Sequence, residues 1–194
     1  MPAIVLSVNP PKRTRRLDVA NKKTLIWAAL IIAVVILLDQ ITKIWAVGAL
    51  TGQPPSQVLG DFLRFTLAYN EGGAMGTRLG SSTYYLVVAI VIFPFIAYYI
   101  YHYRTTRAIA IPLAFIAGGA VGNVIDRIRL GHVIDFIDVD FFDIHIASFS
   151  LTRWWTFNIA DAAIFCAIIF LVLYLGWFRP HESTHATSDS PVPS

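Results

Sequence analysis

Four long apolar runs dominate the hydrophobic pattern of the chain, at residues 25–47, 84–103, 108–128 and 157–177. A helix of about 20 apolar residues crosses a membrane hydrocarbon core of about 30 Å, so each run is long enough to span it. The loops between the runs are modest in length. The pattern therefore predicts an all-α integral membrane protein, with four transmembrane helices in one domain.

Polar segments lie at both ends of this apolar region. Residues 1–23 are polar and basic, and residues 179–194 have too little apolar character to pack, so we expect a disordered tail there. The membrane domain is predicted over residues 24–178. The first apolar run is too long for a cleaved signal peptide, and no small-residue cleavage site closes it. We interpret it as a retained first helix.

The charge distribution predicts an orientation for this hydrophobic chain, in which 56% of the 194 residues are apolar and 14% are charged. Basic residues cluster beside the same ends of the predicted helices, which marks that side as cytoplasmic. These residues are Lys12, Arg13, Arg15, Arg16, Lys22, Lys23, Arg104, Arg107 and Arg179. Both termini are thus expected to be cytoplasmic, with loops 48–83 and 129–156 outside. The net charge of +3 reflects this orientation and does not indicate nucleic-acid binding.

The two outer loops have different patterns. Large apolar residues alternate at Phe65, Leu67 and Tyr69 before a glycine-rich turn, which predicts a small β-element. Such a strand edge can bind an extended peptide, although this segment alone favours a plain hairpin turn. Residues 136–155 mix apolar residues with Asp and His and end at Trp154 and Trp155, which suits a surface loop or helix. Their acidic residues lack the spacing of a metal motif, so no metal site is predicted.

An ionisable pair lies inside the first predicted helix. Asp39 is 14 residues beyond Leu25, which places it about 21 Å into a roughly 30 Å core, towards the outer side. Lys43 follows at i+4 on the same helical face. A local ion pair explains this spacing, and such a pair is compatible with a functional role.

More polar residues are expected at the same outer depth. They are Asn123, Asp126 and Arg127 at the end of the third helix, Asp135 in the loop after it, and Asn158 and Asp161 at the start of the fourth. Asn158 and Asp161 also fit a helix N-cap and its third helical position. Gly118 and Gly122 indicate close helix packing. Ionisable groups inside a membrane bundle are costly and usually mark a functional site.

The residues alone leave three classes of function open. A protease explains carboxylates and amides that gather near one face of the membrane. In a transporter or proton channel, such groups are expected near the membrane midplane, on broken helices. A structural bundle explains the glycines, but not polar groups from four elements at one depth. The pattern therefore favours a protease without excluding the other two classes.

Five short motifs resemble those of a known family. They are DQITK at 39–43, NEGGAMG at 70–76, GGAVGNVIDR at 118–127, VIDFI at 133–137 and FNIAD at 157–161. Their order and the four predicted spans are similar to those of bacterial lipoprotein signal peptidase, or signal peptidase II. In two details the chain differs: Gly73 and Met75 replace the expected alanine and phenylalanine, and the connection between VIDFI and FNIAD is longer than usual.

The resemblance implies an intramembrane aspartyl protease with Asp135 and Asp161 as the catalytic residues and no metal or cofactor. It implies diacylglyceryl-modified prolipoproteins as substrates, cut before the lipidated cysteine at the outer face of the inner membrane, and inhibition by globomycin. We expect a monomer that contacts membrane lipids and no nucleic acid. The supporting positions implied are Asp39, Lys43, Asn70, Gly72, Asn123, Asp126, Arg127, Val133, Asn158 and Ala160.

The supporting residues are expected to position the catalytic groups. We expect Asn123 and Asn158 to orient the aspartates or the substrate, and Asn70 to hold an extended substrate segment. Asp126 and Arg127 are expected to tie the third helix to the loop that carries Asp135. Asp39 and Lys43 are expected to fix the first helix against that loop. The sequence leaves open which catalytic aspartate holds the proton.

Overall fold

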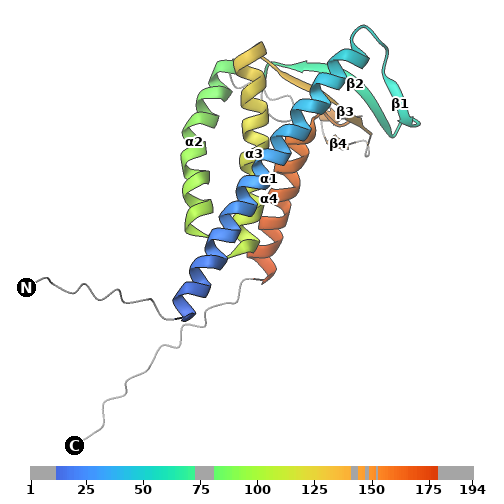
Figure 1. Cartoon of the computed structure of the whole chain (residues 1–194). Helices are drawn as coiled ribbons and strands as arrows, with labels where there is room; N and C mark the ends of the chain where they lie inside the picture. The colour runs from blue at the N-terminus through green and yellow to red at the C-terminus, as the bar shows by residue number, and fades with distance from the viewer. Residues whose placement is uncertain (1–11, 73–80, 141–143, 147–148, 152, 179–194) are drawn as a thin grey trace, which may run out of the picture.

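The computed structural model describes residues 12–72, 81–140, 144–146, 149–151 and 153–178. The elements, in chain order, are α1 (Lys12–Leu50), β1 (Ser56–Leu59), β2 (Leu63–Asn70), α2 (Ser82–His102), α3 (Arg107–Leu130), β3 (Val133–Val139), β4 (Ile144–Ile146), β5 (Phe149–Leu151), α4 (Ile159–Leu173) and the π-helical turn η2 (Tyr174–Phe178). Helices form one long bundle, and the sheet lies across one end of it (Figure 1).

The four predicted membrane helices are confirmed. Among the described residues, four segments are long and apolar enough to cross a membrane: Asn21–Leu50, Ser82–His102, Arg107–Leu130 and Ile159–Trp177. Each overlaps one of the apolar runs. Helix α1 begins earlier, at Lys12, so part of the basic segment 1–23 is already helical. The start of α1 and the end of α4 lie at the end opposite the sheet (Figure 1).

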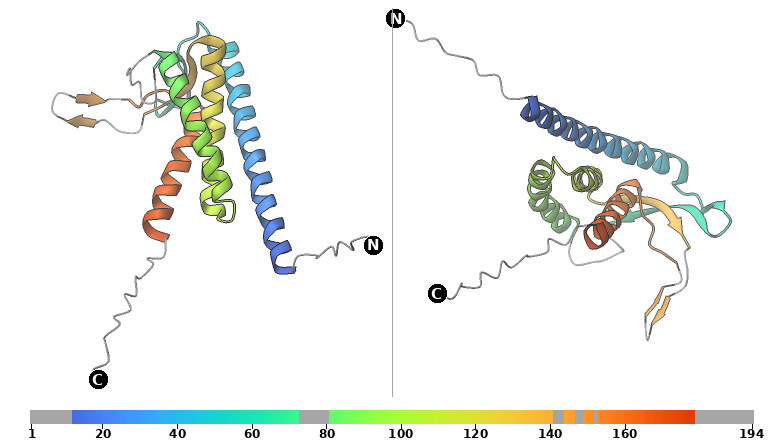
Figure 2. Two further views of the ribbon diagram at one scale, coloured as in Figure 1. Left: turned by 90° about the vertical axis from the view of Figure 1, so that its left-hand side faces the viewer. Right: turned by 90° about the horizontal axis from the view of Figure 1, so that it is seen from below.

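Helix α3 is the centre of the bundle, since it packs against α1, α2 and α4. Its glycines allow this close approach. A Cβ atom on Gly118 would lie 2.9 Å from Val35 Cβ of α1, and one on Gly119 would lie 2.5 Å from the carbonyl oxygen of Ala160 of α4. The packing predicted for the glycines of this helix is therefore confirmed. Figure 2 shows α3 beside all three neighbours when the bundle is seen from below.

A three-stranded antiparallel sheet, with the strand order β1-β2-β3, packs against the C-terminal end of α1. The alternation at residues 65–69 correctly predicted β2. Trp45 of α1 packs edge-on against Phe65 of β2 at 5.1 Å between ring centroids, and against Phe136 of β3 at 6.0 Å. These aromatic contacts fix the sheet on the helix, because each ring buries a large apolar area.

The chain after α3 differs from the expected loop or surface helix. Asp135 lies within β3, where it pairs with Ala68 of β2, and β4 pairs with β5 as a separate hairpin. The run VIDFIDV is rich in β-branched and aromatic residues, and pairing with β2 satisfies the polar groups of its backbone. Phe157 pairs with Ile137 on the other edge of β3. The sheet thus brings the chain just before α4 beside Asp135.

We predict that Gly122→Ala destabilises the protein. The new Cβ would lie 2.5 Å from Asp39 Oδ2, an atom that Lys43 holds in a buried ion pair. Overpacking of this kind costs about 1–3 kcal/mol, so the melting temperature in detergent should fall. Gly48→Ala is the matched control, because nothing lies within 4 Å of its Cβ position on α1. Equal melting temperatures for the two variants would contradict this account of the α1–α3 contact.

Candidate active site

Asp135 is a buried carboxylate held by two amides. Its side chain lies on β3, and the residue is 2% exposed. Asn158 donates from Nδ2 to Asp135 Oδ1 at 2.7 Å, and Asn70, at the end of β2, donates from Nδ2 to Oδ2 at 3.0 Å. The amide of Asn70 thus orients the aspartate, and its expected contact with substrate stays a prediction. Val133, which is buried, pairs with Asn70 across the two strands.

Asp161 lies in the first turn of α4. Asn158 is the N-cap of this helix, and its Oδ1 accepts the backbone N–H of Asp161 at 2.9 Å, as the cap prediction required. Asn123 of α3 donates from Nδ2 to Asp161 Oδ1 at 2.8 Å. The capping position and the contact with Asn123 are therefore compatible, and both determine where the carboxylate points.

Two amides connect the aspartates. Asn158 Nδ2, which contacts Asp135, also lies 3.1 Å from Asn123 Oδ1, and Asn123 in turn contacts Asp161. The expectation that Asn123 and Asn158 orient the aspartates agrees with these hydrogen bonds. Side chains from α3, β3 and α4 thus form one connected polar cluster.

A buried cation supports this cluster from α1. Lys43 Nζ lies 2.8 Å from Asp39 Oδ2, which confirms the local ion pair, and 2.8 Å from Asp126 Oδ2 of α3. It also donates to Asn123 Oδ1 at 2.9 Å. Lys43 is 1% exposed, and a buried charge of this kind is tolerated only with partners that satisfy it. The two partners on α3 were not predicted from the spacing within α1.

The same carboxylates also bind backbone groups that position α4 and β3. Asp39 Oδ1 accepts the N–H of Ala160 at 3.0 Å, and Asp126 Oδ2 accepts the N–H of Ile134 at 3.2 Å. Asp126 therefore ties α3 to the segment that carries Asp135, as expected. Asp39 fixes α1 to the start of α4, whereas the sequence suggested a contact with the loop.

Arg127 has a different role from the expected one. Its Nη2 donates to the carbonyl oxygen of Gly72 at 2.9 Å, and the N–H of Gly72 donates to Asn70 Oδ1 at 2.9 Å. Arg127 therefore fixes the turn after β2, and through Asn70 it acts on Asp135. Gly73 and Met75, the two atypical residues of the motif, lie outside the described residues.

Gln40 is a supporting residue that the sequence analysis missed. Its Nε2 lies 3.0 Å from Asp126 Oδ1 and 3.2 Å from the carbonyl oxygen of Gly122. The available signal was a polar amide next to Asp39, inside an apolar helix and at the same depth as the other polar groups. Gln40 thus adds a second link between α1 and α3.

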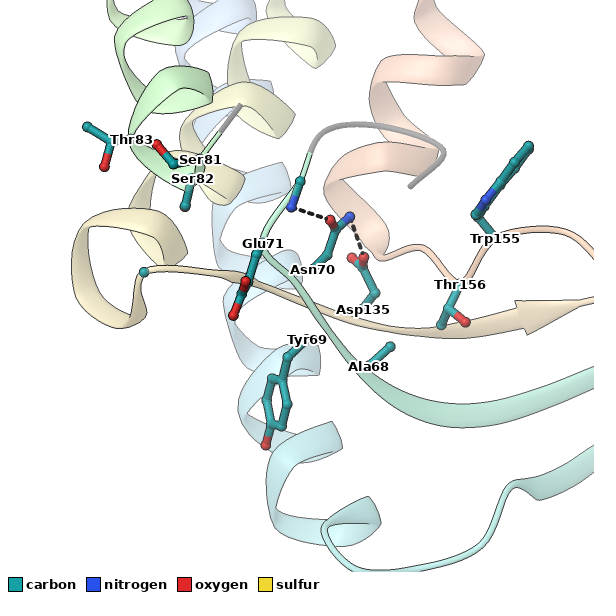
Figure 3. A pocket seen from close by; sticks show the side chains of 12 residues that line it. Ala68, Tyr69, Asn70, Glu71, Ser81, Ser82, Thr83, Asp135, Trp155 and Thr156 are labelled. Carbon is teal, nitrogen blue, oxygen red and sulfur yellow. Dashed lines mark hydrogen bonds between the residues drawn. The ribbon is translucent and has the colours of Figure 1, made fainter. Parts of the chain in front are cut away.

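A cavity of about 790 Å³ opens beside Asp135. Its walls come from the end of β2, the start of α2 and the residues Trp155 and Thr156 that precede α4. Figure 3 shows Asp135 and Asn70 between Ser82 on one side and Trp155 on the other. Asp135 therefore faces a space that is large enough for several substrate residues.

The surroundings of Asp135 shift its protonation. Burial and, next, the negative charge of Asp161 raise the pKa of Asp135 from 3.8 to about 7. Hydrogen bonds from Asn70 and Asn158 and the charge of Lys43 oppose this increase without cancelling it. Two nearby carboxylates with one raised pKa can share a proton at neutral pH, which is the requirement for paired acid and base catalysis.

Comparisons with known proteins identify the family of this chain. The family model described as signal peptidase (SPase) II matches residues 31–177. A lipoprotein signal peptidase of Chlorobium phaeobacteroides is 37% identical over 165 residues, covering 84% of this chain and 98% of the relative. One from Janthinobacterium sp. is 40% identical over 148 residues, covering 74% and 84%.

Two solved structures, both described as bacterial membrane enzymes studied by the in meso method, share the fold with TM-scores of 0.64. One is 25% identical and covers 86% of this chain and 94% of its own. The other is 28% identical and covers 76% and 91%. The family model extends from within α1 to the end of the fourth span and includes the polar cluster, so the chain belongs to the signal peptidase II family.

Proposed function

We propose that this chain is an intramembrane aspartyl endopeptidase that cuts diacylglyceryl-modified prolipoproteins just before the lipidated cysteine. Membership of the family makes it a multi-pass membrane protease and implies removal of signal peptides from prolipoproteins. Because the family consists of peptidases, we no longer retain the hypotheses that the chain is a transporter or a purely structural bundle. The observation that carries the aspartyl mechanism is the pairing of Asp135 and Asp161 through Asn123 and Asn158, beside the cavity.

The two aspartates take different roles in the proposed reaction. We assign the shared proton to Asp135, because it lines the cavity and its pKa is raised to about 7, and we assign to Asp161 the role of the base that removes a proton from the attacking water. Asp135 donates a hydrogen bond to the scissile carbonyl as the water oxygen bonds to its carbon. As the C–N bond breaks, Asp161 passes the proton that it took from the water to the leaving amine, which returns the pair to its starting protonation state. Asp135 lines the cavity, where it can reach the carbonyl of a bound peptide.

We place the site at the outer face of the inner membrane. The polar cluster lies where α3 ends and α4 begins, at the end of the bundle that carries the sheet. Arg104 lies between α2 and α3, and Arg107 begins α3, both at the opposite end, so the positive-inside rule predicts that this end is cytoplasmic. Both termini are then cytoplasmic, and the apolar residues exposed on the helices face membrane lipids around a monomer.

The catalytic proposal predicts that Asp135→Asn and Asp161→Asn each reduce cleavage by about 10²–10⁴-fold, the usual contribution of a general acid or base. Asparagine keeps the shape of the side chain and removes its proton chemistry. The measurement is cleavage of a diacylglyceryl-modified prolipoprotein by purified protein in detergent. Asp61→Asn serves as the matched control, because that carboxylate is 74% exposed and lies outside the cluster. Cleavage at the wild-type rate by either site variant would remove its residue from the mechanism.

Cleavage should also depend on pH in a defined direction. The pKa of Asp135 is raised to about 7, so the singly protonated pair is lost as pH rises through that value. We expect kcat/KM to fall above about pH 7, measured with the same prolipoprotein over a pH series. A flat profile across about pH 6–8.5 would contradict the assignment of the proton to Asp135.

Stability gives an independent check on the same pKa. Because the folded pKa of Asp135 lies above the unfolded value of 3.8, ionisation of Asp135 destabilises the folded state as pH rises between 3.8 and about 7. Asp135→Asn removes this cost. The variant should therefore melt at or above the wild-type temperature at alkaline pH, measured by thermal unfolding in detergent. A clearly lower melting temperature would mean that the Asp135 carboxylate stabilises the fold instead.

A further inference from the structure

A second group of charges lies at the opposite end of β3 from Asp135. Asp138 Oδ2 accepts hydrogen bonds from Arg64 Nη2 at 3.1 Å and from Thr66 Oγ1 at 2.9 Å, both on β2. Asp138 Oδ1 pairs with Nε of Arg153. Burial acts to raise the pKa of Asp138, but the hydrogen bonds from Arg153, Thr66 and Arg64 outweigh it and hold the pKa below the usual value. The proposed chemistry uses none of these residues.

All three guanidinium nitrogens of Arg153 contact oxygen atoms. Besides Asp138, its Nη1 lies 3.0 Å from Asp140 Oδ2, and its Nη2 donates to the carbonyl oxygen of Asp61 at 2.7 Å. The planar fork of arginine suits such multiple contacts, which a lysine ammonium cannot reproduce. The Arg153 side chain is 22% exposed, so its charge is partly shielded from water. One side chain thus joins β3 to the turn between β1 and β2.

The contacts of Arg153 join the two ends of the connection that carries the β4–β5 hairpin. The chain leaves the sheet after Asp140, passes through the β4–β5 hairpin and returns at Arg153. Figure 2 shows this hairpin standing away from the helices. After Arg153 the chain runs back along β3. There the N–H of Trp154 donates to the carbonyl oxygen of Val139 at 3.3 Å, and the N–H of Phe157 donates to the carbonyl oxygen of Ile137 at 2.9 Å.

The returning segment forms a wall of the cavity. Trp155 and Thr156 line the same cavity as Asp135, and Figure 3 shows Trp155 across from the start of α2. The position of this wall relative to Asp135 depends on how the returning segment is held along β3. Arg153 holds that segment at its start, two residues before Trp155.

We propose that Arg153 is a positioning residue for substrate binding, which holds the Trp155–Thr156 wall at a set distance from Asp135. This inference rests on the proposed cleavage of prolipoproteins. Asp135 and Asp161 are held by Asn70, Asn123 and Asn158, and not by Arg153. Loss of Arg153 should therefore weaken substrate binding in the cavity and leave the chemical step nearly unchanged.

The kinetic test compares Arg153→Met with Arg64→Met. Arg153→Met removes charge-assisted hydrogen bonds, so KM for the prolipoprotein should rise about tenfold while kcat stays within about twofold. Arg153→Lys should give an intermediate KM, since it restores the charge but not the fork. Arg64→Met removes another partner of Asp138 without touching the returning segment, so its KM should stay within about twofold of wild type. A fall in kcat alone, or equal effects of the two methionine variants, would overturn the proposal.

A double-mutant cycle shows whether Arg153 acts through the wall. Trp155→Ala alone should raise KM, because it removes the large side chain of the wall. Adding Arg153→Met to Trp155→Ala should then raise KM by clearly less than it does in the wild-type background. Additive effects of the two substitutions would mean that Arg153 acts elsewhere, and the proposal would fail.

Amide hydrogen exchange separates this inference from the proposed function. In Arg153→Met, the amides of Trp154 and Phe157 should exchange about tenfold faster, while those of α3 keep their wild-type rates. Arg64→Met should leave Trp154 and Phe157 unchanged. If wild-type protein fails to cleave the prolipoprotein, the proposed function is wrong, and the exchange rates still decide whether Arg153 holds the segment. Unchanged exchange in Arg153→Met would overturn the inference, even with an active enzyme.

Discussion

The buried ammonium of Lys43 is the interaction on which the sheet-bearing half of this membrane protein depends. It contacts Asp39 on its own helix and Asp126 and Asn123 on α3, all within 2.9 Å. Removing one member of such a buried charge group costs about 3–5 kcal/mol, because the remaining charge loses its partner. Because of this cost, α1 and α3 must pack with Lys43 and Asp126 at the same level of the bundle. The small residues of α3 make the meeting possible, and Gly122 leaves the space that Asp39 occupies.

The aspartate pair takes its geometry from this charge group. Asp39 binds the backbone at the start of α4, Asp126 binds the backbone of β3, and Asn123 binds Asp161 directly. The carboxylates therefore sit on rigid elements, which accurate catalytic positioning requires. The Arg153 contacts lie further along β3 and hold a cavity wall. Two separate sets of charges thus hold the proposed catalytic aspartates and the proposed substrate-facing wall of the cavity.

Local patterns predicted much of this arrangement but missed its long-range contacts. The i+4 spacing of Asp39 and Lys43 predicted their ion pair, and the cap pattern predicted the bond between Asn158 and Asp161. Asp135 was expected in a loop, because the strand partner of β3 lies on β2, far away in the sequence. The residues of a strand of mixed polarity do not by themselves indicate which strand it pairs with.

The sequence by itself determined the four spans, the common depth of the polar residues and the motifs of the family. Each of these depends on the length of an apolar run or on spacing within a short segment. Only the tertiary structure decided which charges pair, why the pKa of Asp135 is raised and how Arg153 closes the connection before α4. Those features arise where residues distant in the chain meet away from water. The local sequence determines neither how deeply a charged side chain is buried nor which residue it contacts.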